Sequence, residues 1–328
     1  MSQSMRPMQA ISATELVDRM LTGDQRALAR LISRVEQDSA DIPAIMQRLY
    51  PALGKAFCIG ITGPPGAGKS TVTDKLTAHV RQLGMTVGII AVDPTSPFSG
   101  GAVLGDRIRM QQHYLDDGVF IRSMATRGRH GGLSHTAKGA IKLLDAFGKD
   151  IIMVETVGVG QTELDIVETA DTTVVILVPE AGDTVQAMKA GLMEIADLFV
   201  VNKADRDGAD RMLMDLRMLV HMNAKADGWE IPVLATQAHV NVGLTELYEA
   251  IQQHHTRLRE TGQLIERRRA HRRRELLELL QHRLFSAILE RMDHDSALNA
   301  LVQQVQDATL DPYTAVQQIV VNYTPSSR

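Results

Sequence analysis

Eight consecutive residues combine glycines, a lysine and a hydroxyl side chain in an order suited to holding phosphate. They match the pattern G-x-x-x-x-G-K-[ST] throughout and read Gly63, Pro64, Pro65, Gly66, Ala67, Gly68, Lys69 and Ser70. In such a loop backbone N–H groups face phosphate oxygens, the lysine reaches the β- and γ-phosphates, and the serine hydroxyl ligates Mg²⁺. The sequence therefore predicts a nucleotide-binding loop, with Thr71 continuing the set into a helix.

A second motif indicates which base the nucleotide carries. Asn202, Lys203 and Asp205 stand in the order N-K-x-D directly after an apolar run. The carboxylate of Asp205 would accept hydrogen bonds from N1–H and N2–H₂ of guanine. Adenine lacks these donors and would leave the carboxylate unpaired. The motif therefore favours GTP and GDP over ATP.

Three acidic residues are candidates for holding Mg²⁺ together with Ser70. Asp93 and Glu155 each follow an apolar run, and Asp106 lies in a glycine-rich stretch. Mg²⁺ prefers six oxygen ligands and keeps several waters, so acids from separate loops are expected around it. Glu155 takes the place of the acid in the D-x-x-G switch of many GTPases, and Gly158 is the glycine whose amide would contact the γ-phosphate.

The γ-phosphate also needs positive charge in its loose transition state. Lys69 and Mg²⁺ supply part of that charge. The further candidates are Arg107, Arg109, Arg127 and Lys189, of which Arg109 and Lys189 are counted among the predicted catalytic residues.

Short apolar runs separated by helical patterns are the elements that must position these motifs. Runs bounded by glycine and proline, without alternation in polarity, are typical of a parallel sheet covered on both faces. We therefore predict an α/β fold with a mostly parallel central sheet, flanked by helical extensions. The runs occupy residues 57–62, 87–92, 119–122, 151–155, 174–178, 198–202 and 231–235.

The composition excludes several classes of protein. The 328 residues carry 35 Lys and Arg against 39 Asp and Glu, and 44% are hydrophobic, which is typical of a folded globular protein. No apolar run approaches the roughly 18 residues of a membrane span, so we expect a cytoplasmic protein without a membrane partner. The aromatic content of 4% argues against nucleic-acid binding by base stacking. Cys58 is the only cysteine, and the histidines lack ligand companions at metal-binding spacing.

One segment differs electrostatically from the rest of the chain. Residues 257–274 hold eight arginines against two glutamates, a local charge of +6. A nucleic-acid patch would have aromatic residues between the arginines, and none are present here. We interpret the segment as the solvated face of a helix, within a dimer arm or a docking surface for an acidic partner.

Taken in order, the motifs resemble those of one family, the MeaB/ArgK G-proteins, to which the human methylmalonic aciduria type A protein belongs. The resemblance covers nearly the whole chain, and E-T-V-G-V-G-Q is its most specific element. It rests on residues 63–70, 93–96, 100–107, 127–128, 131–132, 155–161, 182–183 and 202–205, with Gln186 and Lys189.

The resemblance implies a dimeric GTPase of the SIMIBI branch of P-loop proteins, with Mg²⁺ and GTP or GDP as its ligands. Its expected domains are an N-terminal helical region over 1–54, a G domain over 55–256 and a C-terminal dimerisation arm over 257–328. Members bind an adenosylcobalamin-dependent acyl-CoA mutase, gate cofactor delivery from an adenosyltransferase, and protect or reactivate the mutase. Gln186 and Lys189 would belong to a third switch that relays the presence of the mutase.

The chain departs from the family pattern in places that bear on the partner. Arg107 stands where a lysine is common, and Thr184 and Ala190 replace an acidic and a basic residue of the third switch. The partner mutase could therefore act on methylmalonyl-, isobutyryl-, ethylmalonyl- or 2-hydroxyisobutyryl-CoA.

Two other functions compete with this interpretation. One is a protein kinase linked to amino-acid transport, although the chain has no H-R-D-like loop to supply a catalytic base. The other is a nickel-type metallochaperone GTPase, although such proteins usually carry Cys/His metal motifs, and this chain does not.

Overall fold

The computed structural model describes residues 11–93, 110–125, 135–156, 165–179, 191–223, 227–292 and 295–323. The chain divides into two compact units, residues 1–269 and 270–328, and each is described by itself. In the described part of the chain, no helix is both long and apolar enough to cross a membrane.

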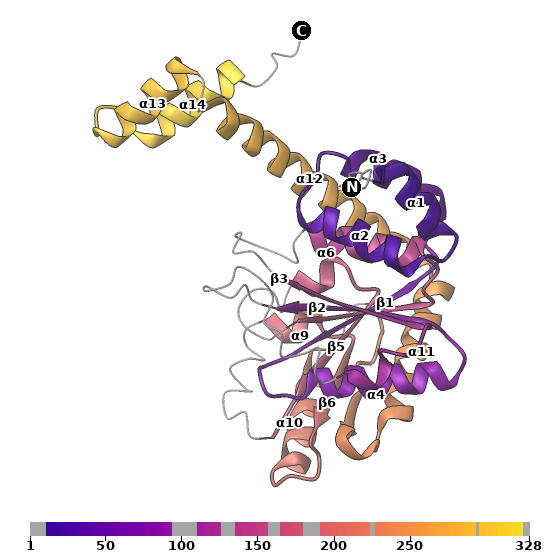
Figure 1. Ribbon diagram of the computed structural model, residues 1–328. Helices are drawn as coiled ribbons and strands as arrows, with labels where there is room; N and C mark the ends of the chain where they lie inside the picture. Colours follow the sequence, from indigo (N-terminus) through magenta and orange to yellow (C-terminus); the bar gives the residue numbers. More distant parts are fainter. Residues whose placement is uncertain are drawn as a thin grey trace, which may run out of the picture. The chain divides into compact units, whose positions relative to one another are not determined.

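A parallel sheet of seven strands forms the centre of the first unit, in the order β3-β2-β4-β1-β5-β6-β7 (Figure 1). All neighbouring strands pair in parallel. The predicted α/β fold with a parallel central sheet is therefore confirmed. The strands are β1 (Phe57–Thr62), β2 (Val87–Asp93), β3 (Val119–Ala125), β4 (Ile151–Thr156), β5 (Thr172–Leu177), β6 (Leu198–Asn202) and β7 (Val233–Thr236).

Helices cover both faces of the sheet, which explains why its strands are apolar without alternation (Figure 1). Every residue of β1, β4, β5 and β6 is buried. On one face Ile59 and Ile61 pack with α4 (Lys69–Gln82) and α11 (Leu244–Glu260). On the other, Cys58 packs with α6 (His135–Ala146) and the N-terminal helices. Successive strand residues point to opposite faces, so the sheet needs both layers.

Three short helices at the N-terminus share a hydrophobic core with the sheet. They are α1 (Ala13–Leu21), α2 (Gln25–Glu36) and α3 (Ile42–Leu49). The side chain of Ser12 accepts a hydrogen bond from the Glu15 N–H, and Asp24 caps α2 in the same way, so local sequence defines both helix starts. Leu28 and Leu31 of α2 are fully buried in the cluster that contains Ile152 of β4.

The remaining elements of the first unit are short, apart from α10. A third hydrophobic cluster joins α10 to β5 and β6 through Leu216, Val175 and Phe199. The remaining elements of the first unit are η1 (Tyr50–Ala52), η2 (Gln111–His113), η3 (Ile166–Glu168), α9 (Met193–Ile195), α10 (Ala209–Met222) and η5 (Ala238–Val240).

Helix α12 (Gln263–Met292) begins in the first unit, and its first turns are bonded to the sheet. The Arg268 guanidinium donates to both carboxylate oxygens of Asp171, at 2.8 and 2.6 Å. Arg267 donates to Asp197 at 2.8 Å, and both aspartates are only 3% exposed. Two arginines of the basic segment are therefore structural, which differs from the solvated face expected for all of them.

The second unit is helical and buries little of its apolar surface. It contains the rest of α12, α13 (Ser296–Gln306) and α14 (Pro312–Tyr323). Leu298 and Ala315 are its buried hydrophobic residues among those described. Large exposed side chains include Leu276, Leu277, Leu280, Leu284, Phe285, Leu289, Tyr313, Val316, Val320 and Val321.

Candidate nucleotide-binding site

The sheet brings the predicted motifs to one edge. Because all strands are parallel, the carboxyl ends of β1, β4, β6 and β7 lie at one edge of the sheet. Glu155 sits next to Ile61 in the register of β4 with β1, and next to Ala91 of β2. Motifs that are distant in sequence therefore meet where a ligand of a doubly wound sheet is expected.

The loop between β1 and α4 needs glycine at two positions for steric reasons. Gly63 and Gly68 have φ values of +139° and +84°, conformations that other residues rarely adopt. A Cβ atom on Gly63 would lie 2.0 Å from the carbonyl oxygen of Ile176, and one on Gly68 would lie 2.5 Å from Nδ2 of Asn202. The backbone can therefore follow this tight path only without side chains there.

Lys69 lies inside the curve of the loop. Its Nζ donates to the carbonyl oxygens of Gly63 at 2.8 Å and of Pro64 at 3.0 Å, and the residue is only 6% exposed. These bonds hold the ammonium group at the N-terminal end of α4, where the helix dipole adds positive potential. The arrangement suits the binding of phosphate oxygens.

Ser70 and Glu155 form a pair of oxygen groups beside the loop. The Ser70 hydroxyl donates to Oε1 of Glu155 at 2.5 Å, and both residues are buried. Thr156 donates to Thr62 at 2.9 Å, which fixes the ends of β4 and β1 against each other. A hydroxyl and a carboxylate are the ligand types that Mg²⁺ prefers, so this donor set fits the ion.

Asp93 ends β2, which pairs with β4, so its backbone lies at the same edge of the sheet. Five further predicted site residues lie outside the described residues. They are Asp106, Arg109, Gly158, Gln186 and Lys189.

Asn202 ties the phosphate loop to the end of the sheet. Its Nδ2 donates to the carbonyl oxygen of Ala67 at 2.9 Å. Its Oδ1 accepts from the Thr236 hydroxyl at 3.1 Å and from the Ala238 N–H at 3.2 Å. The first residue of the N-K-x-D motif therefore organises the site without exposing its amide.

The other residues of this motif border a cavity of about 240 Å³. Lys203 has a φ of +55°, and Asp205 is exposed at the cavity rim. The cavity reaches Gly68 and Thr71 of the phosphate loop, so one continuous space adjoins both predicted motifs. Its lining is Gly68, Thr71, Asn202, Lys203, Asp205, Arg206 and His239.

The motifs in the sequence did not indicate the contribution of the chain after β7. Thr236 and Ala238 bond Asn202, and His239 lines the cavity. The seventh apolar run could have indicated these residues. A residue that follows a strand of a parallel sheet lies at the edge where ligands bind. Arg206 adjoins the N-K-x-D motif and could have been found from that position.

Cys58 offers no nucleophile to the site. It lies in β1 on the face of the sheet packed against the N-terminal helices, and it is buried. Burial raises the pKa of its thiol far above the ordinary value, so the thiolate does not form at neutral pH.

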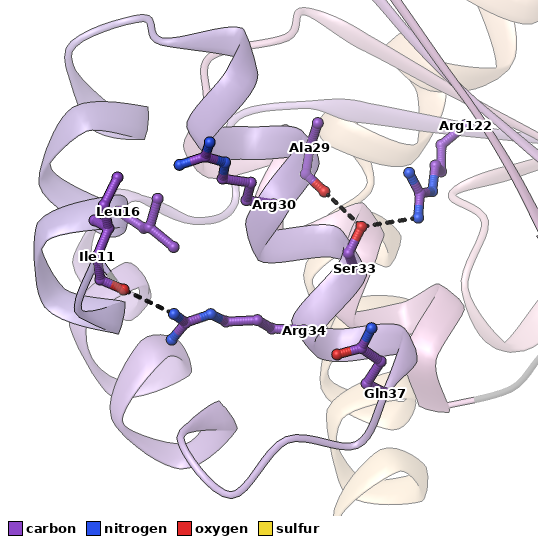
Figure 2. Close-up of a pocket in the computed structure, with 8 residues that line it drawn as sticks. All are labelled: Ile11, Leu16, Ala29, Arg30, Ser33, Arg34, Gln37 and Arg122. Carbon is purple, nitrogen blue, oxygen red and sulfur yellow. Dashed lines mark hydrogen bonds between the residues drawn. The ribbon is translucent and has the colours of Figure 1, made fainter. Parts of the chain in front are cut away.

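A second cavity, of about 380 Å³, lies between α1, α2 and β3 (Figure 2). Two of its arginines already have structural partners. Arg34 bonds Asp41 and the carbonyl oxygen of Ile11, and Arg122 bonds Glu36 and the Ser33 hydroxyl. These bonds attach the N-terminal helices to one another and to the edge strand.

Comparison with known proteins now identifies the family. A family described as methylmalonyl-CoA mutase-associated GTPase MeaB matches residues 28–293. The chain belongs to the MeaB family. A Pyrococcus abyssi protein named as a GTPase is 49% identical over 309 residues, which is 93% of this chain and 95% of that protein. GTP hydrolysis is therefore the activity of this chain, as the motifs predicted.

Two further relatives cover most of this MeaB-family chain. The mitochondrial methylmalonic aciduria type A homolog of Mus musculus is 31% identical, over 93% of this chain and 79% of that protein. The crystal structure of a LAO/AO transport system kinase superposes with a TM-score of 0.71 at 26% identity, covering 96% of this chain and 98% of that one.

Proposed function

We propose that this GTPase is a chaperone of an adenosylcobalamin-dependent acyl-CoA mutase, and that GTP hydrolysis gates cofactor loading and the protection or reactivation of the mutase. The match to the mutase-associated MeaB family over residues 28–293 carries the proposal. The murine relative, named for methylmalonic aciduria, supports the same class of partner. An adenosyltransferase would deliver the cofactor, and the cytoplasm would be the location.

The phosphate loop would hold the triphosphate by charge and by backbone N–H groups. Lys69, already held inside the loop by Gly63 and Pro64, would exchange these carbonyl contacts for the β- and γ-phosphates. Ser70 and Glu155 would hold Mg²⁺, directly and through water, together with Asp93 and Asp106. The ion would neutralise charge that develops between the β- and γ-phosphates.

Guanine would occupy the cavity beside the N-K-x-D motif. Asp205 would accept from the two guanine donors, and the chain after β7 would support the base from the side of His239. Asn202 would keep the base site and the phosphate loop at a constant separation, because it bonds both.

The second unit would serve as the dimerisation arm. Its large apolar side chains are exposed, as the 65% exposed Leu276 and 63% exposed Phe285 illustrate. Several large apolar side chains exposed together are typical of a protein–protein interface. A second copy of the chain is the proposed partner.

The mutase role predicts that a cognate mutase accelerates GTP turnover. Purified acyl-CoA mutases from the same cell would each be added to the GTPase, and phosphate release would be measured. We expect turnover to rise at least about tenfold with one of them, a threshold well below the roughly 10³- to 10⁵-fold activation that a partner's arginine gives other GTPases. Lys69→Ala is the control that abolishes turnover in both conditions. If no mutase changes the rate, the chaperone proposal is wrong.

The kinase alternative predicts a different fate for the γ-phosphate. The solved LAO/AO relative is named a kinase, so the fate of the γ-phosphate is tested directly. With γ-labelled GTP, we expect the label in free phosphate only. Label transferred to a protein of the same cell would favour the kinase.

A further inference from the structure

A pair of buried hydroxyls connects the carboxyl ends of β1 and β4. The Thr156 hydroxyl donates to the Thr62 hydroxyl at 2.9 Å, and both residues are fully buried. The backbone register of β1 with β4 ends one residue earlier, at Ile61 and Glu155. The side-chain bond therefore extends the connection between the two strands by one residue, to the point where the phosphate loop leaves β1.

This bond lies behind the oxygen pair that fits Mg²⁺. Glu155, directly before Thr156, accepts from the Ser70 hydroxyl at 2.5 Å. Met153 belongs to the cluster on the α4 face of the sheet, and Val154 belongs to the cluster on the opposite face. Because successive strand residues alternate between faces, Glu155 points to the α4 face and Thr156 points away from it. Any effect of the Thr156 hydroxyl on the ion therefore passes through Glu155.

Packing alone does not require a hydroxyl at residue 156. A valine has the same branching at Cβ as a threonine, and it avoids the cost of burying a hydroxyl. Val92, which pairs with Thr156 in the register of β2 with β4, is buried and apolar in this way. A buried polar pair whose bond is formed fixes one arrangement of the elements that it joins. The hydroxyl of Thr156 therefore serves the geometry of the strand ends.

We propose that Thr156 is a positioning residue for Mg²⁺, because its bond to Thr62 holds Glu155 at a fixed separation from Ser70. Groups that orient the ligands of a metal ion typically contribute about 10- to 100-fold to metal affinity. The inference rests on the proposed assignment of Ser70 and Glu155 to Mg²⁺, and it does not depend on the mutase role.

Thr77 provides a matched control in the same core. It is fully buried, and its hydroxyl donates to the carbonyl oxygen of Thr73 at 2.7 Å and lies 3.7 Å from Sδ of Met153. Met153 precedes Glu155 by two residues on β4, so Thr77 contacts the same strand farther from its carboxyl end. Thr77→Val removes a buried hydroxyl from this core and leaves the Thr156 bond in place.

The experiment measures Mg²⁺ binding separately from turnover, in wild type, Thr156→Val, Thr156→Ser, Thr77→Val and Glu155→Gln. Each protein would be loaded with a non-hydrolysable GTP analogue and titrated with Mg²⁺ in a calorimeter. The affinity for the analogue in EDTA and the urea midpoint of unfolding would be measured as well. Serine keeps the hydroxyl of Thr156, whereas valine keeps its shape without the hydroxyl.

We expect the Mg²⁺ dissociation constant to rise at least about tenfold in Thr156→Val, and to stay near the wild-type value in Thr156→Ser and Thr77→Val. The affinity for the analogue in EDTA should be unchanged in all three variants. The urea midpoints of the two valine variants should fall by similar amounts, because each loses one buried hydroxyl bond. The proposal is wrong if Thr156→Val binds Mg²⁺ as wild type does, if Thr77→Val weakens Mg²⁺ binding equally, or if Thr156→Ser does not restore it.

Glu155→Gln separates this proposal from the site assignment on which it rests. A carboxamide carries no charge, so Mg²⁺ binding should weaken at least as much as in Thr156→Val. Weaker binding in Glu155→Gln together with unchanged binding in Thr156→Val would refute the positioning role alone. Unchanged binding in Glu155→Gln would refute the assignment of Glu155 to the ion, and the positioning role with it.

Discussion

At the scale of residues, the site contains two kinds of side chain. Some form hydrogen bonds within the protein, and others face the nucleotide cavity. Asn202 belongs to the first kind, because both ends of its amide are bonded within the protein. Asp205 belongs to the second, because it is exposed at the cavity rim. Two residues of one four-residue motif therefore have different predicted consequences when substituted.

Asp205→Asn should change the base preference. An amide N–H would repel the N1–H and N2–H₂ donors of guanine, but it can donate to the 2-oxo group of xanthine. We expect the affinity for GDP to fall by about a hundredfold, because two hydrogen bonds to a charged group are lost. The affinity for xanthosine diphosphate (XDP) should rise. Calorimetric titration with both nucleotides measures this. Asp207→Asn, an exposed neighbour, is the control, and unchanged GDP affinity in Asp205→Asn would contradict the assignment.

At the scale of elements, helix α12 is attached to the sheet by charged side chains. No residue of α12 is buried, yet Arg268 bonds Asp171 and also the carbonyl oxygens of Gly54 and Ala56. Asp171 accepts in addition from the Cys58 N–H at 2.9 Å. The attachment thus joins α12 to the beginning of β1 and to the chain that enters β5.

Arg268→Met should destabilise the first unit strongly. The Asp171 carboxylate would remain buried without its main cationic partner, which costs about 3–5 kcal/mol for a broken buried pair. Arg269→Met is the matched control, because Arg269 pairs with Glu266 at 64% exposure and surface pairs contribute about 0–1 kcal/mol. Urea unfolding of both variants measures the difference. Equal midpoints would show that the Arg268 bonds add nothing to stability.

At the scale of the whole molecule, the two units differ in how much apolar surface they bury. The first unit contains three hydrophobic clusters, whereas the second buries Leu298 and Ala315 among its described residues and exposes many larger side chains. A helical unit with so small a core gains stability by covering that surface, which supports the proposed dimer.

Replacing Leu280 and Leu284 together by Asp should therefore dissociate the proposed dimer. Both side chains are exposed and lie one helical turn apart, so the two charges would fall within one interface patch. Sedimentation velocity should give the mass of a dimer for wild type and of a monomer for the double variant. Arg273→Asp, also exposed on α12, should leave the mass unchanged. A wild-type protein that sediments as a monomer would refute the arm.

The sequence by itself determined the chemistry and the fold class. The phosphate loop, the N-K-x-D motif and the seven apolar runs are local patterns, and each depends on the conformational freedom or polarity of neighbouring residues. Only the tertiary structure decided which of these parts meet. Ser70 reaches Glu155 and Asn202 reaches Thr236 because β1 neighbours β4 and β6 neighbours β7. Arg268 reaches Asp171 because the start of α12 lies against the sheet. Strand order follows from crossovers over many residues, and a local pattern does not encode it.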